Sequence, residues 1–168
     1  MQIAAPGIIC SRNACLCRAF CNRRVSFVWD RAAGKLNLKG AGEGTLDELK
    51  TQFEDKEIVF AAYKVFGVEL DPSSGDPTTG TPVFSSKRCK IIQITWVGPS
   101  VSPIHRNAVL SSKDARDRLF QSVAIDIQGS DLSDITEKKI AKQLINCGGA
   151  HKPTHYVFST SYLPVAEL

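Results

Sequence analysis

The feature that most constrains the fold is a nearly continuous apolar run at 58–70, "IVFAAYKVFGVEL". The run is too short to span a bilayer, and Lys64 interrupts it. Its Val, Ile, Phe and Tyr residues favour strands, and near-continuous apolar character is typical of a strand that is buried on both faces. The run therefore predicts a buried strand over 57–70 inside a layered structure.

Shorter segments with strand character surround this run. Alternation and β-forming residues predict strands at 24–30, around 36–38, at 87–98, at 122–128 and at 154–160. The segment 32–44 is expected to hold a turn and a glycine loop. The segment 71–82 is dense in Pro, Gly, Ser and Thr, which indicates a surface loop that joins two strands as a long hairpin connection.

Capping residues mark the expected helices. The helices are predicted over 12–22 after Ser11, over 45–53 after Thr45, over 102–120, and from Asp131 or Ser133 to about Asn146, where Gly148 and Gly149 follow. Helices and strands interspersed in this way predict an α/β domain with a mixed β-sheet that has helices on both faces. We expect one domain over 5–160 and a C-terminal tail over 161–168.

Size and charge agree with one globular domain. The chain has 168 residues, of which 43% are hydrophobic, and this is enough for a core. The net charge of +4 is too small to indicate nucleic-acid binding by itself. The N-terminus lacks the basic region of a secretory signal, so we expect a cytoplasmic protein.

Four of the six cysteines lie close together, at Cys10, Cys15, Cys17 and Cys21. Their spacing fits poorly to structural zinc sites, which usually combine two closely spaced pairs of ligands. We interpret them as the small apolar side of a helix in a reducing compartment. A thiol- or metal-dependent protein that uses Cys15, Cys17 and Cys21 is the alternative.

Other catalytic patterns find little support in the sequence. His105, His151 and His155 have no recognisable spacing to a Cys or Asp partner. The segment "GAGEG" at 40–44 precedes a helix, but the Lys-Ser/Thr of a phosphate-binding loop does not follow it. We therefore expect no enzyme activity, no metal and no cofactor.

The segment 102–120 has two unlike faces when it is treated as one helix. Val101, Ile104, Ala108, Ala115 and Leu119 fall on one side and are expected to pack on the sheet. The opposite side carries Arg106, Leu110, Lys113 and Asp117, which indicates either a solvated face or a protein-binding stripe.

The motifs from 87 onward resemble the actin-depolymerising-factor homology family. "KRCKIIQITW", "SSKDA" and "DIQGSDLSD" are similar to the ADF/cofilin pattern of a basic strand start, an apolar strand that ends in Trp, S-S-K-D-A, and V-Q-G-T-D-x-S-E. "WVGPSVSPIHR" and "NCGGA" resemble the coactosin branch. The resemblance is specific over about 87–150 and colinear over 11–70.

This resemblance implies a non-enzymatic protein that binds actin through its long helix. It assigns actin contacts to Arg106, Lys113, Asp114 and Arg118, with Leu110 among them. Basic residues suit this role because actin is acidic, and complementary charge raises the association rate. The expected partners are actin filaments, with monomeric actin as an open alternative, and the protein itself is expected to be a monomer.

A second, filament-binding surface is implied for the strand start and the last long helix. It would use Lys87, Arg88 and Lys90 together with Lys138 and Lys142. Lys138, Lys139 and Lys142 form a basic ridge that is also compatible with phosphoinositide binding.

Several positions depart from the family pattern. Asp117 stands where the first of two basic residues is usual, Asn107 where Met is usual and Ile104 where Arg is usual. Lys142, Gln143 and Asn146 replace a Glu and two Arg, and Pro6-Gly7-Ile8 replaces the regulatory serine. These departures predict filament binding with weak or absent severing.

Overall fold

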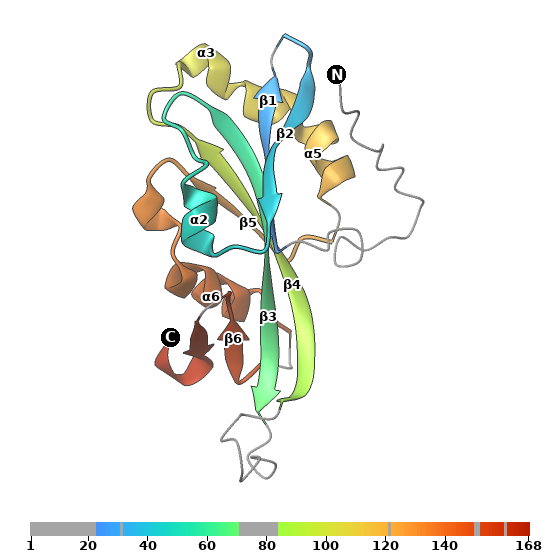
Figure 1. The fold of residues 1–168 in the computed structure, drawn as a ribbon, viewed down its shortest axis with the longest axis vertical. Coiled ribbons are helices and arrows are strands. Elements are labelled where there is room, and N and C mark those ends of the chain that lie inside the picture. The colour runs from blue at the N-terminus through green and yellow to red at the C-terminus, as the bar shows by residue number, and fades with distance from the viewer. Residues whose placement is uncertain (1–22, 31, 71–83, 121, 150–151, 160) are drawn as a thin grey trace.

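The structure is a computed structural model that describes residues 23–30, 32–70, 84–120, 122–149, 152–159 and 161–168. The predicted helix at 12–22 and the cysteines at 10, 15, 17 and 21 lie outside these ranges. Within them the chain forms a sheet with helices on both faces, which confirms the predicted fold class (Figure 1). None of the described helices combines the length and apolar character needed to cross a membrane.

The sheet is mixed. Its strands are β1 (Arg24–Asp30), β2 (Lys35–Gly42), β3 (Ile58–Leu70), β4 (Phe84–Val97), β5 (Ile125–Gly129), β6 (His155–Val157) and β7 (Tyr162–Pro164). The order is β2-β1-β3-β4-β5, and β5 is parallel to β4 while the other pairs are antiparallel. The predicted run is the central strand β3, which pairs antiparallel with β4 over its whole length. The loop predicted at 71–82 lies outside the described residues.

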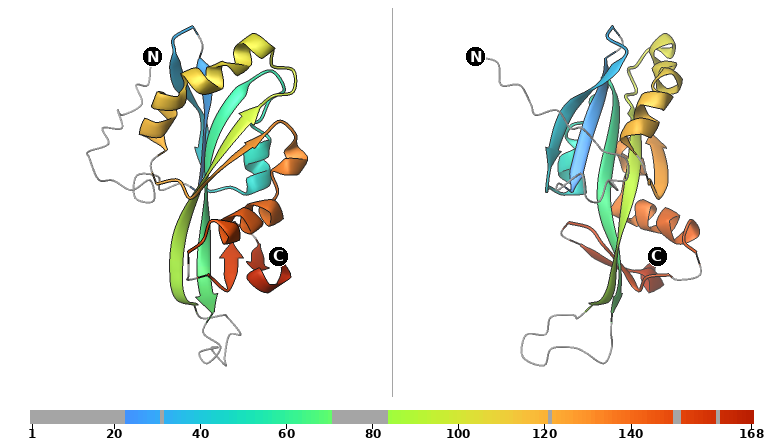
Figure 2. Two further views of the ribbon diagram at one scale, coloured as in Figure 1. Left: turned by 180° about the vertical axis from the view of Figure 1, so that it is seen from behind. Right: turned by 90° about the vertical axis from the view of Figure 1, so that its right-hand side faces the viewer.

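The helices lie on opposite faces of this sheet. α2 (Leu46–Lys50) and α6 (Glu137–Asn146) pack on one core, and α3 (Pro103–Arg106), α4 (Ala108–Ser111) and α5 (Lys113–Leu119) pack over the core on the other face. Figure 2 shows the α3–α5 segment on the side of the sheet opposite α2. A larger core on the first face joins α2, α6 and the C-terminal residues, and a smaller core lies under α3–α5. Alternate side chains of β3 enter the two cores, which is why almost every residue of the run is apolar.

Two predicted element boundaries are wrong for local reasons. The glycine-rich segment stays in β2 as far as Gly42, because Gly40 and Gly42 pair with Ser26 and Arg24 next to an irregular step in β1. α6 begins after Thr136, whose hydroxyl accepts the Lys139 amide at 3.3 Å, rather than after Asp131 or Ser133. Asp131 instead caps the 3-10 turn η1 (Leu132–Asp134).

The expectation for 102–120 needs the largest correction. The segment is three short helices, and its buried side carries Val101, Ser112, Arg116 and Phe120. Ile104 and Leu119, which were expected to pack on the sheet, are 70% and 36% exposed. The interruptions at Asn107 and Ser112 break the 100° periodicity on which the prediction depended.

The C-terminal residues pack on the larger core. β7 pairs with β6, and the 3-10 turn η2 (Val165–Glu167) follows. Leu163, Val165 and Leu168 pack against the buried residues, and Tyr156 and Phe158 of the preceding segment are 2% and 0% exposed.

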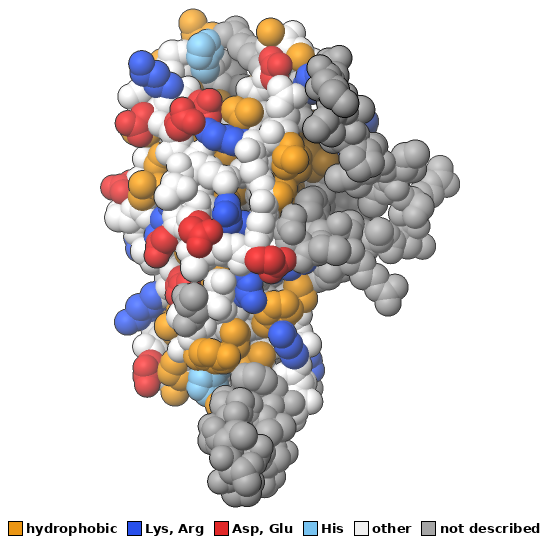
Figure 3. All heavy atoms as spheres, in the orientation of Figure 1, with side chains coloured by type: hydrophobic (Ala, Val, Ile, Leu, Met, Phe, Trp, Pro, Cys, Tyr) orange, Lys and Arg blue, Asp and Glu red, His pale blue; other side chains and the backbone are white. Residues whose placement is uncertain are grey.

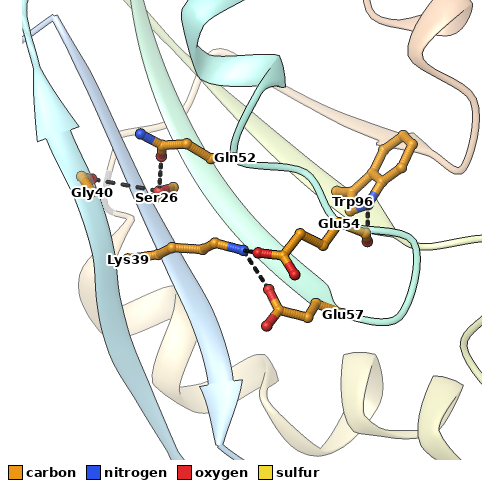
Figure 4. A network of polar contacts seen from close by, with 7 residues as sticks. All are labelled: Ser26, Lys39, Gly40, Gln52, Glu54, Glu57 and Trp96. Atoms are coloured by element: carbon orange, nitrogen blue, oxygen red, sulfur yellow. Dashed lines mark hydrogen bonds and ion pairs between the residues drawn. The ribbon is translucent and has the colours of Figure 1, made fainter.

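A polar network holds β2 and the turn at 54–57 together on the α2 face (Figure 4). Lys39 Nζ donates to Glu54 Oε1 at 2.7 Å and also to Glu57, while the Trp96 indole donates to the Glu54 carbonyl at 2.9 Å. Burial by itself lowers the pKa of the Lys39 ammonium group, but the hydrogen bonds and charges of Glu54 and Glu57 outweigh this effect and raise it.

Gly98 sets where the chain leaves the sheet for α3. Its amide donates to the Glu57 carbonyl at 3.0 Å, and the Ser100 amide donates to the Asp55 carbonyl at 2.9 Å. A Cβ atom on Gly98 would lie 2.2 Å from the Asp55 carbonyl oxygen. Only glycine therefore permits this close approach of two backbone segments.

We expect Gly98→Ala to reduce the free energy of unfolding by about 1–3 kcal/mol, because backbone must move to relieve the overlap. Urea denaturation measures this change. Gly149→Ala is the matched control, since a Cβ atom there meets nothing within 4 Å. Equal stability of the two variants would contradict the expectation.

Candidate functional site

The helical segment from Val101 to Phe120 crosses the sheet face opposite α2 and α6 (Figure 2). Pro103 begins α3, where its missing N–H is harmless and its fixed φ favours the helix. The amides of His105 and Arg106 donate to the Ser102 carbonyl at 2.9 and 3.1 Å. Val101 and Phe120 are 5% exposed and anchor the two ends.

The predicted actin contacts all lie on the exposed side of this segment. We call Arg106, Leu110, Lys113, Asp114 and Arg118 the outer face, and each of these side chains is exposed. Leu110 is 77% exposed, the highest fraction among the large apolar side chains of the described residues. Arg106 Nε donates to the Val101 carbonyl at 3.3 Å, which ties this guanidinium to the start of α3.

The outer face combines apolar surface with charges of both signs. Arg106, Lys113 and Arg118 are basic, and Asp114 together with the neighbouring exposed Asp117 is acidic. An exposed leucine surrounded by charged groups has the composition of a protein-binding surface rather than of a small-molecule site.

Sequence reasoning missed two apolar contributors to this side. Ile104 and Leu119 were assigned to the core, yet both are exposed next to the predicted contacts. The sequence does contain a signal for the buried side, because Ser112, Arg116 and Phe120 follow one another at a spacing of four residues and are all buried. Ile104 and Leu119 do not belong to this row. Because Arg116 is basic and Ser112 is polar, a search for apolar periodicity does not detect this buried row.

A hollow adjoins the outer face beside Arg106. Val97, Arg106 and Val109 line it together with Gln128, Gly129 and Ser130 at the end of β5. The parallel pairing of β4 and β5 brings Val97 next to the end of β5, although the two strands are far apart in the sequence.

The predicted filament-binding residues of β4, Lys87, Arg88 and Lys90, do not all lie on the same face of the sheet. Side chains of successive residues point to opposite faces of a strand. Arg88 and Lys90 share the face of Ile92 and Ile94, which pack in the α6 core, and they line a small hollow with Gly67 and Pro153.

Lys87 points to the other face of the sheet. Its Nζ lies 4.1 Å from the centroid of the Phe66 ring, a cation–π distance. The structure therefore brings Arg88 and Lys90 together on the α6 side and separates Lys87 from them.

The basic ridge on α6 is exposed at Lys138, Lys139 and Lys142. Ile140, Ala141 and Leu144 hold the opposite side of the helix in the core. Lys139 Nζ pairs with Asp134 at 2.7 Å, which partly neutralises the ridge. Figure 3 shows basic and acidic side chains interspersed over the surface seen in the orientation of Figure 1.

The described residues do not assemble a group of three or more His, Cys, Asp and Glu side chains that could hold a metal. Cys89 is half-buried and Cys147 is exposed, and both are free thiols. His105 is exposed at the start of the helical segment, while His155 lies in β6. His151 and the N-terminal cysteine cluster lie outside the described residues.

Comparisons with known proteins agree on one family. The model for the family described as cofilin/tropomyosin-type actin-binding protein matches residues 22–145. Cofilin of Eremothecium gossypii is 38% identical over 112 residues, which cover 66% of this chain and 69% of that protein. Coactosin of Entamoeba histolytica is 28% identical over 128 residues, which cover 76% of this chain and 74% of that protein.

Solved structures support the same fold. The crystal structure of coactosin from Entamoeba histolytica aligns with a TM-score of 0.59 at 24% identity, and the alignment covers 75% of this chain and 81% of that one. The crystal structure of cofilin from Streptomyces griseoflavus aligns with a TM-score of 0.56 at 18% identity, and this alignment covers 74% and 83%.

Proposed function

The chain belongs to the cofilin/tropomyosin-type family of actin-binding proteins, and on this premise we propose that it binds the side of actin filaments through the outer face. One observation carries the proposal: Leu110 is 77% exposed among charged side chains, on a helical segment whose other side is buried. An exposed leucine in that setting is a candidate for the apolar centre of an interface.

The charges of the outer face would guide this association. Arg106, Lys113 and Arg118 attract an acidic partner, while Asp114 favours a particular orientation and Asp117 opposes binding. The exposed apolar residues Ile104 and Leu110 would supply the contacts that exclude water.

A second contact to the neighbouring subunit of the filament would use the α6 side of the sheet. Arg88 and Lys90 on β4 and Lys138 and Lys142 on α6 are the residues we assign to it. Lys87 faces the other side, so we expect it to contribute less than Arg88 and Lys90. The α6 ridge also supports phosphoinositide binding as an additional role of the same lysines.

Co-sedimentation tests the main proposal. We expect the protein to pellet with actin filaments, and we expect the bound fraction to fall when salt rises from about 50 mM to about 150 mM, because exposed charges are screened. A sample without actin controls for self-aggregation. If the protein stays in the supernatant with filaments at every salt concentration, the proposed function is wrong.

Filament imaging tests the turnover activity. We propose weak or absent severing, because Asp117, Gln143 and Asn146 lack the charges that the family pattern has at these positions. Each missing contact at a partly exposed rim is worth about 0.2–1 kcal/mol, and several together weaken binding about tenfold. Rapid fragmentation by substoichiometric protein would show that these substitutions are unimportant.

We further propose a cytoplasmic monomer without enzymatic activity. The family match and the protein-binding character of the outer face support this assignment. Metal analysis of the purified protein separates it from the thiol or metal alternative, since a stoichiometric metal would favour a role for Cys15, Cys17 and Cys21.

A further inference from the structure

Arg116 is the one charged residue that is buried among the described residues. It is 8% exposed, and the other buried polar residues, Ser26, Gln93, Thr95 and Ser112, are uncharged. It points from α5 toward the sheet, on the side opposite the outer face. None of the contacts proposed above uses it.

The guanidinium of Arg116 contacts two strands directly and a third through Thr95. Its Cζ lies 5.0 Å from the centroid of the Phe60 ring in β3, which is a cation–π distance. Its Nη1 donates to Thr95 Oγ1 in β4 at 3.4 Å. Thr95 Oγ1 donates in turn to Asp126 Oδ1 in β5 at 3.3 Å.

The charge of Arg116 affects the pKa of Asp126, the last residue in this series of contacts. Burial raises the pKa of the Asp126 carboxyl, while the Thr95 hydrogen bond and the charge of Arg116 oppose that rise. Asp126 itself is exposed on β5, so it reaches Arg116 through Thr95 rather than as a buried partner.

Apart from Arg116, the side of α5 that faces the sheet carries few large buried side chains. Between Val109 and Phe120 the buried inward residues are Ser112 and Arg116. Ser112 Oγ donates to the Val109 carbonyl at 3.1 Å, so this bond stays within the segment and does not reach the sheet. Ala115 is half-buried and small. On the buried side of α5, Arg116 therefore makes a directional contact with the sheet.

We propose that Arg116 is a positioning residue for the actin-binding surface, which sets the rotation and height of α5 through its contacts with Thr95 and Phe60. Apolar contacts are non-directional and allow a short helix to slide, whereas a charged hydrogen bond selects one arrangement. That arrangement keeps Lys113, Asp114 and Arg118 exposed on the outer face. The inference rests on the proposed function of the outer face.

This role separates binding from stability. A buried charge is costly to desolvate, and replacing Arg116 with an apolar side chain of similar volume leaves no buried charge behind, because Thr95 is uncharged and Asp126 is exposed. A residue that only supported the fold would lower stability and binding together when replaced. A positioning residue would leave stability unchanged or higher and still weaken binding.

The first test compares Arg116→Met with Lys50→Met. Both remove one positive charge, and Lys50 lies on α2, across the sheet from the outer face. We expect Arg116→Met to keep or raise the urea midpoint and to weaken filament co-sedimentation about fivefold, within the range for residues that act without touching the ligand. Lys50→Met should bind like the unmodified protein.

A second variant tests the route through Thr95. Thr95→Val removes the acceptor and keeps the shape, so it should also weaken filament binding. Because the two residues act as one unit, the double variant should bind no more weakly than Arg116→Met alone. Independent, multiplying losses would overturn the proposed coupling.

The outcomes distinguish this inference from the proposed function. If the unmodified protein does not pellet with filaments, the proposed function has failed. If it pellets and folded Arg116→Met pellets equally well, the positioning role is wrong. If Arg116→Met does not fold, Thr95→Val decides, since unchanged binding or loss of folding in that variant also overturns the inference.

Discussion

The double variant Arg106→Ala/Lys113→Ala is expected to lose at least about tenfold in affinity for actin filaments, since a hydrogen bond to a charged group that becomes buried is worth about 1.5–3 kcal/mol. Both side chains are exposed on the outer face and face away from the core. The free energy of unfolding should change by less than about 1 kcal/mol, with the Arg106 bond to the Val101 carbonyl as the main loss. Co-sedimentation and urea denaturation measure the two quantities.

Lys35→Ala/Lys50→Ala is the matched control for this experiment. It removes the same net charge from β2 and α2, outside both proposed surfaces. We expect it to bind filaments within about twofold of the unmodified protein, because distant charges are screened at physiological salt. Equal losses in the two double variants would mean that overall charge, rather than the outer face, controls binding. A folded Arg106→Ala/Lys113→Ala variant with full affinity would place the site elsewhere.

Phe158→Ala is expected to reduce the free energy of unfolding by about 3–5 kcal/mol, the usual range for a large aromatic residue in a core. Phe158 is fully buried, and its ring stacks on Tyr63 of β3 with centroids 6.4 Å apart. It lies after residue 145, where the match to the family model ends. The variant therefore measures how much this C-terminal region contributes to the stability of the domain.

Tyr162→Ala is the aromatic control in the same region. Tyr162 lies in β7 and is 58% exposed, so its removal should cost about 1 kcal/mol or less. Urea denaturation of both variants gives the comparison. A loss below about 1 kcal/mol for Phe158→Ala would mean that the C-terminal region is dispensable for folding.

Local sequence patterns predicted the sheet and several helix boundaries correctly. The apolar run at 58–70 is β3, and the alternating segment at 24–30 is β1. Thr45 caps α2 by accepting the Glu48 amide, and α6 ends at Asn146. These features depend on residues that are close in the sequence, because strand alternation and helix capping are interactions over a few positions.

Motif positions likewise indicated the family and the outer face. Arg106, Lys113 and Asp114 were assigned from short motifs, and all three are exposed on one segment. The motifs located these exposed positions correctly, whereas helical periodicity over the same segment placed the exposed Ile104 and Leu119 in the core.

Tertiary structure alone decided which side of 102–120 faces the sheet and what holds it there. A basic residue is expected to be exposed, but Arg116 is buried because its guanidinium contacts Phe60 and Thr95 on two strands, and Thr95 in turn bonds to Asp126 on a third. The C-terminal residues form a strand and pack in the core because β6 pairs with the part of the β3 edge that β1 leaves unpaired. Both results depend on contacts between residues far apart in the sequence, whereas the sequence by itself determined the elements whose stabilising interactions are local.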